Sequence, residues 1–186
     1  KSKLIIFGGG FSGQRIATLA RCLGVNVLCS RRQKESEGAD FIFNTEKELP
    51  NEILEGATHI LSCIPPSLNG EDPVLVKLKN KLLNSKKLEW VGYLSTTGVY
   101  GDAKGNWVDE NTSPNPKQER SKRRFGCERE WIETNLPVQI LRLPGIYGPG
   151  RSAFENLFNG TTKMIDKPGQ VFSRIHVDDI AGSVLF

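Results

Sequence analysis

A glycine-rich turn near the N-terminus constrains the fold of this chain more than any other feature. It spans residues 8–13, follows the apolar run of residues 4–7, and precedes apolar residues at helical spacing. The order of strand, turn and helix fits the G-x-G-x-x-G pattern with Gly8, Gly10 and Gly13. In that pattern the first glycine allows a sharp turn, the second a close approach to a pyrophosphate, and the third close packing of the helix.

The first turn of this helix offers a site for an anion. Main-chain N–H groups around Phe11, Ser12 and Gly13 have no partner within the helix, and the helix dipole adds positive potential there. The turn therefore predicts a dinucleotide ligand. A purely structural glycine turn is the alternative, because such turns are common.

The next strand, predicted over residues 25–29, indicates which dinucleotide. NAD-binding folds of this kind usually place an acidic residue about twenty residues past the glycines, where it accepts from the ribose 2′-OH. Here no acid precedes Glu35, and Ser30, Arg31 and Arg32 occupy the position instead. A hydroxyl and two guanidinium groups suit a 2′-phosphate, which favours NADP over NAD. NAD stays open, and the alternative for these residues is an exposed basic loop.

The rest of the chain alternates strands with helices. Further strands are predicted over residues 41–43, 58–64, 88–94 and 138–143, and helices over residues 73–83 and 117–135. This alternation predicts an α/β fold, a Rossmann-type doubly wound parallel sheet with helices on both faces. Since ligands bind at the carboxyl ends of such strands, we expect Ser62, Ile64 and Pro65 beside the cofactor.

Composition narrows the class of protein. A length of 186 residues predicts one domain. The net charge of +4 suits an anionic small molecule but is too small to indicate nucleic acid. The four cysteines are scattered, which predicts reduced, mostly buried thiols and neither a disulfide framework nor a metal site. With no apolar stretch of membrane-spanning length and no signal-peptide pattern, we expect a cytoplasmic protein without membrane partners.

Four segments together resemble one family. They are the glycine turn and residues 95–101, 141–150 and 174–181. Their order and separation resemble the short-chain dehydrogenase/reductases, in particular the extended and atypical members grouped as NAD-dependent epimerase/dehydratases, and the glycine spacing resembles a YeeZ-like subgroup. The resemblance implies a NAD(P)-binding domain over residues 1–186, in which residues 144–186 begin the substrate-binding part. It also implies a missing C-terminal part, as does a chain that starts without Met and stops at Phe186 within a helical pattern.

The chemistry of the family needs a tyrosine acid/base, a lysine four residues later on the same helix face, and a Ser or Thr hydroxyl. Thr96 matches the hydroxyl. With the family's following glutamate set on Glu128, however, Arg124 takes the lysine position and Arg120 the tyrosine position. Deprotonating an arginine at neutral pH costs about 8 kcal/mol, so Arg120 cannot replace the tyrosine. Arg124 can still hydrogen-bond the nicotinamide ribose.

A structural alternative exists for this basic helix. It is a solvated face braced by ion pairs of Glu119 with Arg123 and of Arg124 with Glu128. Tyr100 and Lys104 form a literal Y-x-x-x-K, but the glycines around Lys104 predict a turn, so the two side chains should not share a helix face. Tyr100 is kept as a candidate substitute acid.

The last two family segments offer weaker candidates. Residues 148–151 predict a turn in which Arg151 is a candidate for binding an anionic substrate. Asp178 and Asp179 are expected to cap the last helix, and His176 to pack or hydrogen-bond at the edge of the pocket.

The sequence thus predicts a NADP(H)-binding, epimerase/dehydratase-like oxidoreductase that acts on a carbonyl or nucleotide-sugar-type small molecule without the Tyr-Lys dyad. The alternative is a non-catalytic NADP(H) sensor that reports to a protein partner, and a nucleic-acid binder is a distant third. The oligomeric state is open, with a homodimer among the options.

Overall fold

The computed structural model describes residues 2–33, 38–164 and 166–186. Its centre is a six-stranded sheet with the strand order β3-β2-β1-β4-β5-β6, in which every neighbouring pair is parallel. The strands are β1 (Lys3–Phe7), β2 (Asn26–Arg31), β3 (Phe41–Ile42), β4 (His59–Ser62), β5 (Trp90–Thr96) and β6 (Val138–Leu143). The predicted doubly wound α/β fold is confirmed.

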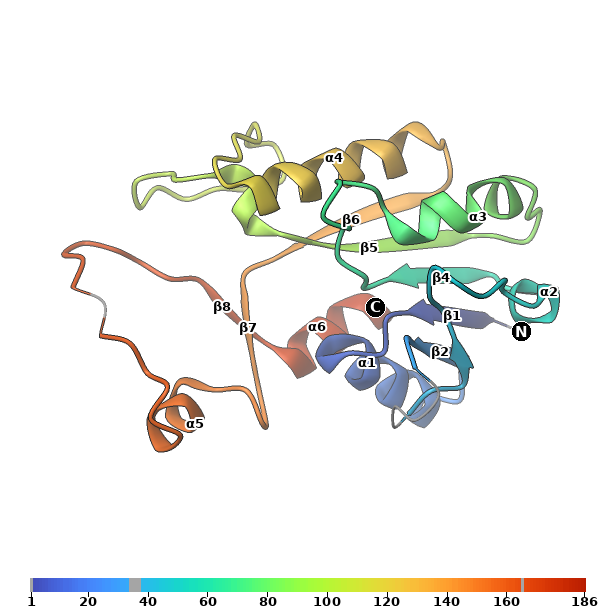
Figure 1. Cartoon of the computed structure of the whole chain (residues 1–186), viewed down its shortest axis with the longest axis horizontal. Coiled ribbons are helices and arrows are strands. Elements are labelled where there is room, and N and C mark those ends of the chain that lie inside the picture. The colour runs from blue at the N-terminus through green and yellow to red at the C-terminus, as the bar shows by residue number, and fades with distance from the viewer. Residues whose placement is uncertain (1, 34–37, 165) are drawn as a thin grey trace.

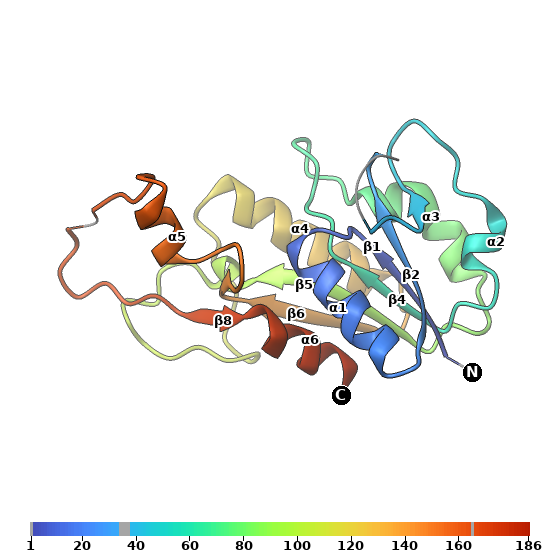
Figure 2. The ribbon, with the colours of Figure 1, turned by 90° about the horizontal axis from the view of Figure 1, so that it is seen from below.

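Helices cover both faces of this sheet. The helices α1 (Phe11–Cys22) and α6 (Val177–Leu185) pack together on one face, and α3 (Pro73–Leu83) and α4 (Glu119–Glu133) lie on the other (Figure 1). The view from below shows α1 and α6 side by side across the strands (Figure 2). A short helix, α2 (Asn51–Leu54), precedes β4.

The alternation of side chains along β1 explains the two layers. Ile5 and Phe7 are fully buried among the apolar residues of α3 and α4, whereas Leu4 and Ile6 are buried against α1 and α6. Successive side chains of a strand point to opposite faces, so a strand that is apolar throughout requires a covering layer on each side.

The segment after β6 leaves the sheet. The strands β7 (Gly145–Tyr147) and β8 (Arg174–His176) form a separate parallel pair, and α5 (Ala153–Phe158) lies away from the sheet body (Figures 1 and 2). This segment exposes large apolar side chains, namely Phe154, Leu157, Phe158, Met164 and Val171.

Most predicted elements are found, and some bounds shift. The helix over 73–83 and the strand over 138–143 agree with the structure. The strand predicted over 88–94 instead spans Trp90–Thr96, because the main chain of Ser95 and Thr96 pairs with β6 although their side chains are polar. Helix α4 is shorter than the predicted 117–135, since Asn135 adopts a left-handed conformation with φ of 57°.

The start of α6 corrects a prediction. The N-cap is His176, whose Nδ1 accepts a hydrogen bond from the Asp178 N–H over 3.2 Å. Asp178 and Asp179 lie in the first turn of the helix and do not cap it. The ring of His176 also packs edge-on against Tyr147, with 5.1 Å between ring centroids.

Candidate functional site

The glycine turn connects β1 to α1 at the carboxyl edge of the sheet, with geometry that agrees with its three predicted local roles. Gly8 has a φ of 98°, which favours glycine. A Cβ on Gly13 would overlap the carbonyl oxygen of Gly8, whereas a Cβ on Gly10 would meet nothing within 4 Å. The space in front of Gly10 is therefore open, and α1 begins there without a side-chain cap or an acidic residue in its first turn.

The end of β2 is fastened to this turn. The Gly8 N–H donates to Ser30 Oγ over 3.0 Å, and the Gly9 N–H donates to the Ser30 carbonyl oxygen over 2.6 Å. Ser30 is only 1% exposed. Its hydroxyl oxygen therefore holds the turn in place, a role that the sequence did not indicate.

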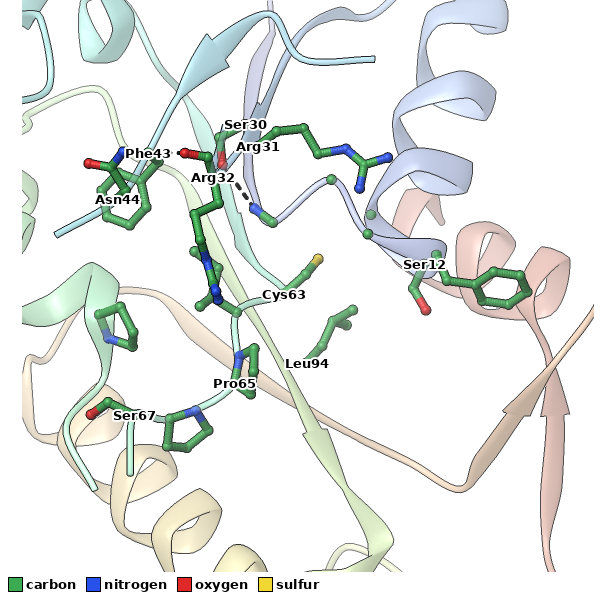
Figure 3. Close-up of a pocket in the computed structure, with 18 of the residues that line it drawn as sticks. Ser12, Ser30, Arg31, Arg32, Phe43, Asn44, Cys63, Pro65, Ser67 and Leu94 are labelled. Carbon is green, nitrogen blue, oxygen red and sulfur yellow. Dashed lines mark hydrogen bonds between the residues drawn. The ribbon is translucent and has the colours of Figure 1, made fainter. Parts of the chain in front are cut away.

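The two arginines after Ser30 take different directions. Arg31 turns toward the glycine turn and α1, whereas Arg32 extends across the cleft toward the loop with Cys63 and Pro65 (Figure 3). The Asn44 side-chain amide donates to the Arg32 carbonyl oxygen over 3.2 Å, which joins the loops after β2 and β3. Glu35, the first acid after this strand, lies outside the described residues.

These segments surround a cleft of about 720 Å³ at the carboxyl ends of the strands. It lies where β1 stands between β2 and β4, the point at which the order of the strands reverses. The structure places twelve of the predicted residues at this cleft: Gly8, Gly10, Phe11, Ser12, Gly13, Ser30, Arg31, Arg32, Ile64, Pro65, Arg124 and Arg151.

Three predicted residues are not among those that line the cleft: Ser62, Thr96 and Tyr100. Ser62 is fully buried, and its hydroxyl has no hydrogen-bond partner among the described residues. Thr96 Oγ1 caps the short 3₁₀ helix η1 (Thr97–Tyr100) by accepting from the Gly98 N–H over 3.1 Å.

Sequence reasoning missed several residues that line the cleft, including Asn44, Thr45, Ser67, Lys77, Leu143 and Ile146. Asn44, Thr45 and Ser67 lie in loops that follow strands, Leu143 ends β6, and Ile146 lies within β7, so the carboxyl ends of the strands were the signal for most of them. Lys77 lies on α3, and only the tertiary structure brings it to the cleft.

Arg124 reaches the cleft from α4. Its Nη1 donates to the Leu94 carbonyl oxygen over 2.9 Å and to the Tyr93 hydroxyl over 3.3 Å. Burial raises the pKa of Tyr93, and the nearby charge of Arg124 offsets this rise only in part. Tyr93 is therefore a neutral residue of the core. The predicted ion pair of Arg124 with Glu128 is wrong, because both groups have other partners.

Glu128 faces inward from α4. It is 1% exposed, and it accepts two hydrogen bonds from Arg142, of which the one from Nη2 is 2.7 Å long. Ser95 also donates its hydroxyl to this carboxylate. Hydrogen bonding to Glu128 raises the pKa of Arg142, which stays charged.

Tyr100 stands at the end of this buried network. The Arg142 guanidinium lies over its ring, with Cζ 4.8 Å from the ring centroid. Lys104 adopts a left-handed φ of 52° in the following turn, so Tyr100 and Lys104 share no helix face, as predicted. Arg120, which the sequence assigns to the family's tyrosine position, lies exposed on α4.

Neither a metal site nor a membrane span is found in the described part of the chain. No group of three or more His, Cys, Asp or Glu side chains there could hold a metal ion. None of the helices formed by the described residues is long and apolar enough to cross a bilayer. Cys29 and Cys127 are buried as predicted, but Cys22 is exposed.

Comparisons with known proteins agree with this geometry. No family model matches the chain. The structure of a functionally unknown protein from Silicibacter pomeroyi DSS is 38% identical, with a TM-score of 0.89 over 100% of this chain and 67% of that one. The structure of a proposed NAD-dependent epimerase/dehydratase from Methylobacillus flagellatus is 27% identical, with a TM-score of 0.72 over 99% of this chain and 68% of that one. Protein YeeZ of Escherichia coli K12 is 28% identical over 98% of this chain and 71% of YeeZ.

The sheet order and the glycine-turn cleft define a Rossmann-type α/β protein. Together with these relatives they identify the family. The chain belongs to the atypical, extended short-chain dehydrogenase/reductases of the NAD-dependent epimerase/dehydratase type, as a relative of YeeZ.

Proposed function

We propose that the chain binds NADP(H) in the cleft and acts as an epimerase/dehydratase-like oxidoreductase whose proton donor is not the usual tyrosine of its family. The observation that carries this proposal is the cleft itself, in which an uncapped helix start and two arginines face one space at the strand switch point. A diphosphate would lie against the N–H groups of the first turn of α1, in front of Gly10.

The preference for NADP rests on the end of β2. Arg31 and Arg32 line the cleft where an NAD-binding fold usually carries a carboxylate. Guanidinium groups offer forked donors to phosphate oxygens, and each such bond contributes about 1.5–3 kcal/mol. Ser30 would support the 2′-phosphate chiefly by fixing the loop, because its oxygen already accepts from Gly8.

The substrate proposed is a carbonyl compound or a nucleotide-sugar-type molecule. The relative from Methylobacillus flagellatus carries an epimerase/dehydratase name, which supports this class. Residues 144–186 would begin the substrate-binding part, and their exposed apolar side chains offer a surface for it.

Three residues are proposed near the reacting atoms. Arg124 lines the cleft from the family's lysine position and would hydrogen-bond the nicotinamide ribose. Thr96 would contact the substrate oxygen. Tyr100 would serve as the substitute acid, and the guanidinium of Arg142 lies over its ring.

Calorimetric titration with NADPH and NADH tests the cofactor. The protein should bind NADPH at least about tenfold more tightly, since one phosphate contact contributes about 1.4 kcal/mol or more. The double variant Arg31→Ala/Arg32→Ala should lose the preference and keep NADH binding. Equal affinities for both cofactors in the unmutated protein would remove the 2′-phosphate argument.

A non-catalytic NADP(H) sensor is the second candidate, favoured by the exposed Arg120 at the tyrosine position. Two labelling experiments decide between the two: deuterated NADPH with a panel of carbonyl compounds, and NADP+ with nucleotide sugars deuterated on their ring carbons. An oxidoreductase transfers the label, and Tyr100→Phe or Thr96→Ala should slow the transfer by about a hundredfold, the scale of acid–base catalysis. Binding of NADPH without any transfer supports the sensor.

A further inference from the structure

Arg151 occupies a position that the proposed cofactor site does not yet use. It lines the same cleft as the glycine turn, although it lies in the segment after β7. Its guanidinium Cζ lies 5.4 Å from the ring centroid of Phe11, the first residue of α1. A cation from the C-terminal part of the chain is thereby held at the start of the phosphate-binding helix.

The turn that carries Arg151 is held firmly by its own hydrogen bonds. The Gly148 N–H donates to the Arg151 carbonyl oxygen and the Arg151 N–H to that of Gly148, each over 3.0 Å. Gly150 has a φ of 77°, and its N–H donates to Glu155 Oε1 over 3.0 Å. Glu155 is thus engaged with the turn.

Gly148 brings the turn against α1. It is buried, and a Cβ on it would lie 3.2 Å from Cζ of Phe11 and 2.7 Å from Cγ1 of Val177. A larger residue would push the turn away from the helix. Glycine at this position therefore fixes how closely Arg151 approaches the start of α1.

The charges at this place call for an anion between them. The first turn of α1 has no acidic residue and no side-chain cap, so its N–H groups and the helix dipole leave a positive potential. Arg151 adds a full positive charge that faces the same cleft. Two positive groups held together gain stability when a bound anion lies between them.

The position of Arg151 along the cleft indicates which part of a ligand it would contact. Ser12, the neighbour of Phe11, lies on the opposite side of the glycine turn from Arg32 and Asn44 (Figure 3). Because Arg151 lies over Phe11, it stands at the end of the cleft away from the proposed 2′-phosphate site.

We infer that Arg151 and the first-turn N–H groups of α1 hold the diphosphate of the cofactor from two sides, an arrangement called here the diphosphate clamp. This inference rests on the proposed cofactor site. The clamp assigns to Arg151 the phosphate on the nicotinamide side, and it links cofactor binding to the segment proposed to begin the substrate-binding part.

Calorimetric titrations with NADPH and with 2′,5′-ADP test the clamp. The second probe carries the 2′-phosphate and a single 5′-phosphate, and it lacks the nicotinamide-side phosphate. Arg151→Ala should weaken NADPH binding by about tenfold or more, since a charged hydrogen bond is lost, and should change 2′,5′-ADP binding by less than about twofold. Arg151→Lys should recover part of the NADPH affinity.

Arg174→Ala is the matched control. Arg174 also lies over an aromatic ring, with Cζ 5.2 Å from the centroid of Phe172, but it is not among the residues that line the cleft. The Arg174→Ala substitution removes the same charge and the same kind of contact with an aromatic ring, and it should leave the NADPH affinity unchanged. Should Arg151→Ala fail to fold, Arg151→Gln keeps a polar side chain of intermediate length and removes the charge.

Unchanged NADPH affinity in Arg151→Ala and Arg151→Gln would overturn the clamp, as would an equal loss for NADPH and 2′,5′-ADP. Failure of the unmutated protein to bind either probe would instead refute the proposed cofactor site, and the clamp with it. The two failures are therefore distinguishable in one set of titrations.

Discussion

The two sides of the cleft are built in different ways. On the phosphate side, formed by the glycine turn and the end of β2, the contacts are made by main-chain atoms and one hydroxyl, that of Ser30, and the close packing depends on the absence of glycine side chains. On the β5–α4 side, the contacts are made by charged side chains, with the buried Glu128 and Arg142 at their centre. A backbone site keeps its sequence pattern, whereas a side-chain site can exchange its residues, as we predict for Arg120 and Arg124 at the positions of the family's dyad.

The largest expected effect tests the β5–α4 side. Glu128→Ala leaves the Arg142 guanidinium and the Ser95 hydroxyl without their buried acceptor. Breaking one partner out of a buried pair costs about 3–5 kcal/mol in the free energy of unfolding. Urea denaturation followed by circular dichroism measures this loss.

Glu133→Ala is the control on the same helix. Glu133 also pairs with an arginine, Arg129, but the pair is 3.8 Å long and both side chains are about two-thirds exposed. Its removal should change the free energy of unfolding by less than about 0.5 kcal/mol. Similar losses for the two variants would mean that the buried pair does not organise this side.

An intermediate effect tests the phosphate side, where substitution of one glycine should lower the stability of the ligand-free protein and substitution of another should not. Gly13→Ala places a methyl group against the Gly8 carbonyl oxygen and should destabilise the ligand-free protein by about 1–3 kcal/mol, which lowers the melting temperature by about 2–4 °C per kcal/mol. Gly10→Ala meets nothing within 4 Å and should leave the melting temperature unchanged.

Gly10→Ala should nevertheless weaken NADPH binding by about tenfold or more, because its methyl group occupies the space proposed for the diphosphate. Thermal unfolding with and without NADPH measures both quantities. If Gly10→Ala keeps the full NADPH affinity, the ligand does not lie in front of Gly10. If Gly13→Ala has the same melting temperature as the unmutated protein, the close packing of α1 against the turn is contradicted.

The same difference explains what the sequence could predict. The fold and the phosphate side follow from local signals, since the glycine spacing and the apolar strands act over short distances. The partner of Glu128 does not follow from local signals. Helix spacing indicates Arg124, whereas the tertiary structure brings Arg142 of β6 to the carboxylate. The cap of α6 differs from the prediction for a local reason, since His176 is a less common cap than the aspartates after it.

The smallest expected effect concerns a contact between the phosphate side and the C-terminal segment. It is the exposed ion pair between Arg15 of α1 and Asp178 of α6, which is 2.5 Å long with both side chains nearly half exposed. The hydrogen bond from Arg15 lowers the pKa of Asp178. A carboxyl whose pKa is lower in the folded state stabilises the fold above its unfolded pKa of about 3.9, and this contribution is lost as the pH falls through the folded value.

Asp178→Asn should therefore be slightly less stable than the unmutated protein at pH 7 in low salt. The difference should be lost at an acid pH below the lowered pKa of Asp178 and should shrink in 1 M NaCl, where the Debye length is about 3 Å. Asp179→Asn is the control, because Asp179 shares the first turn of α6 and its dipole. Urea denaturation at both pH values measures the two differences. If the two variants behave alike at every pH, the link between α1 and α6 depends on their apolar packing, and the charge of Arg15 has no part in joining the phosphate side to the C-terminal segment.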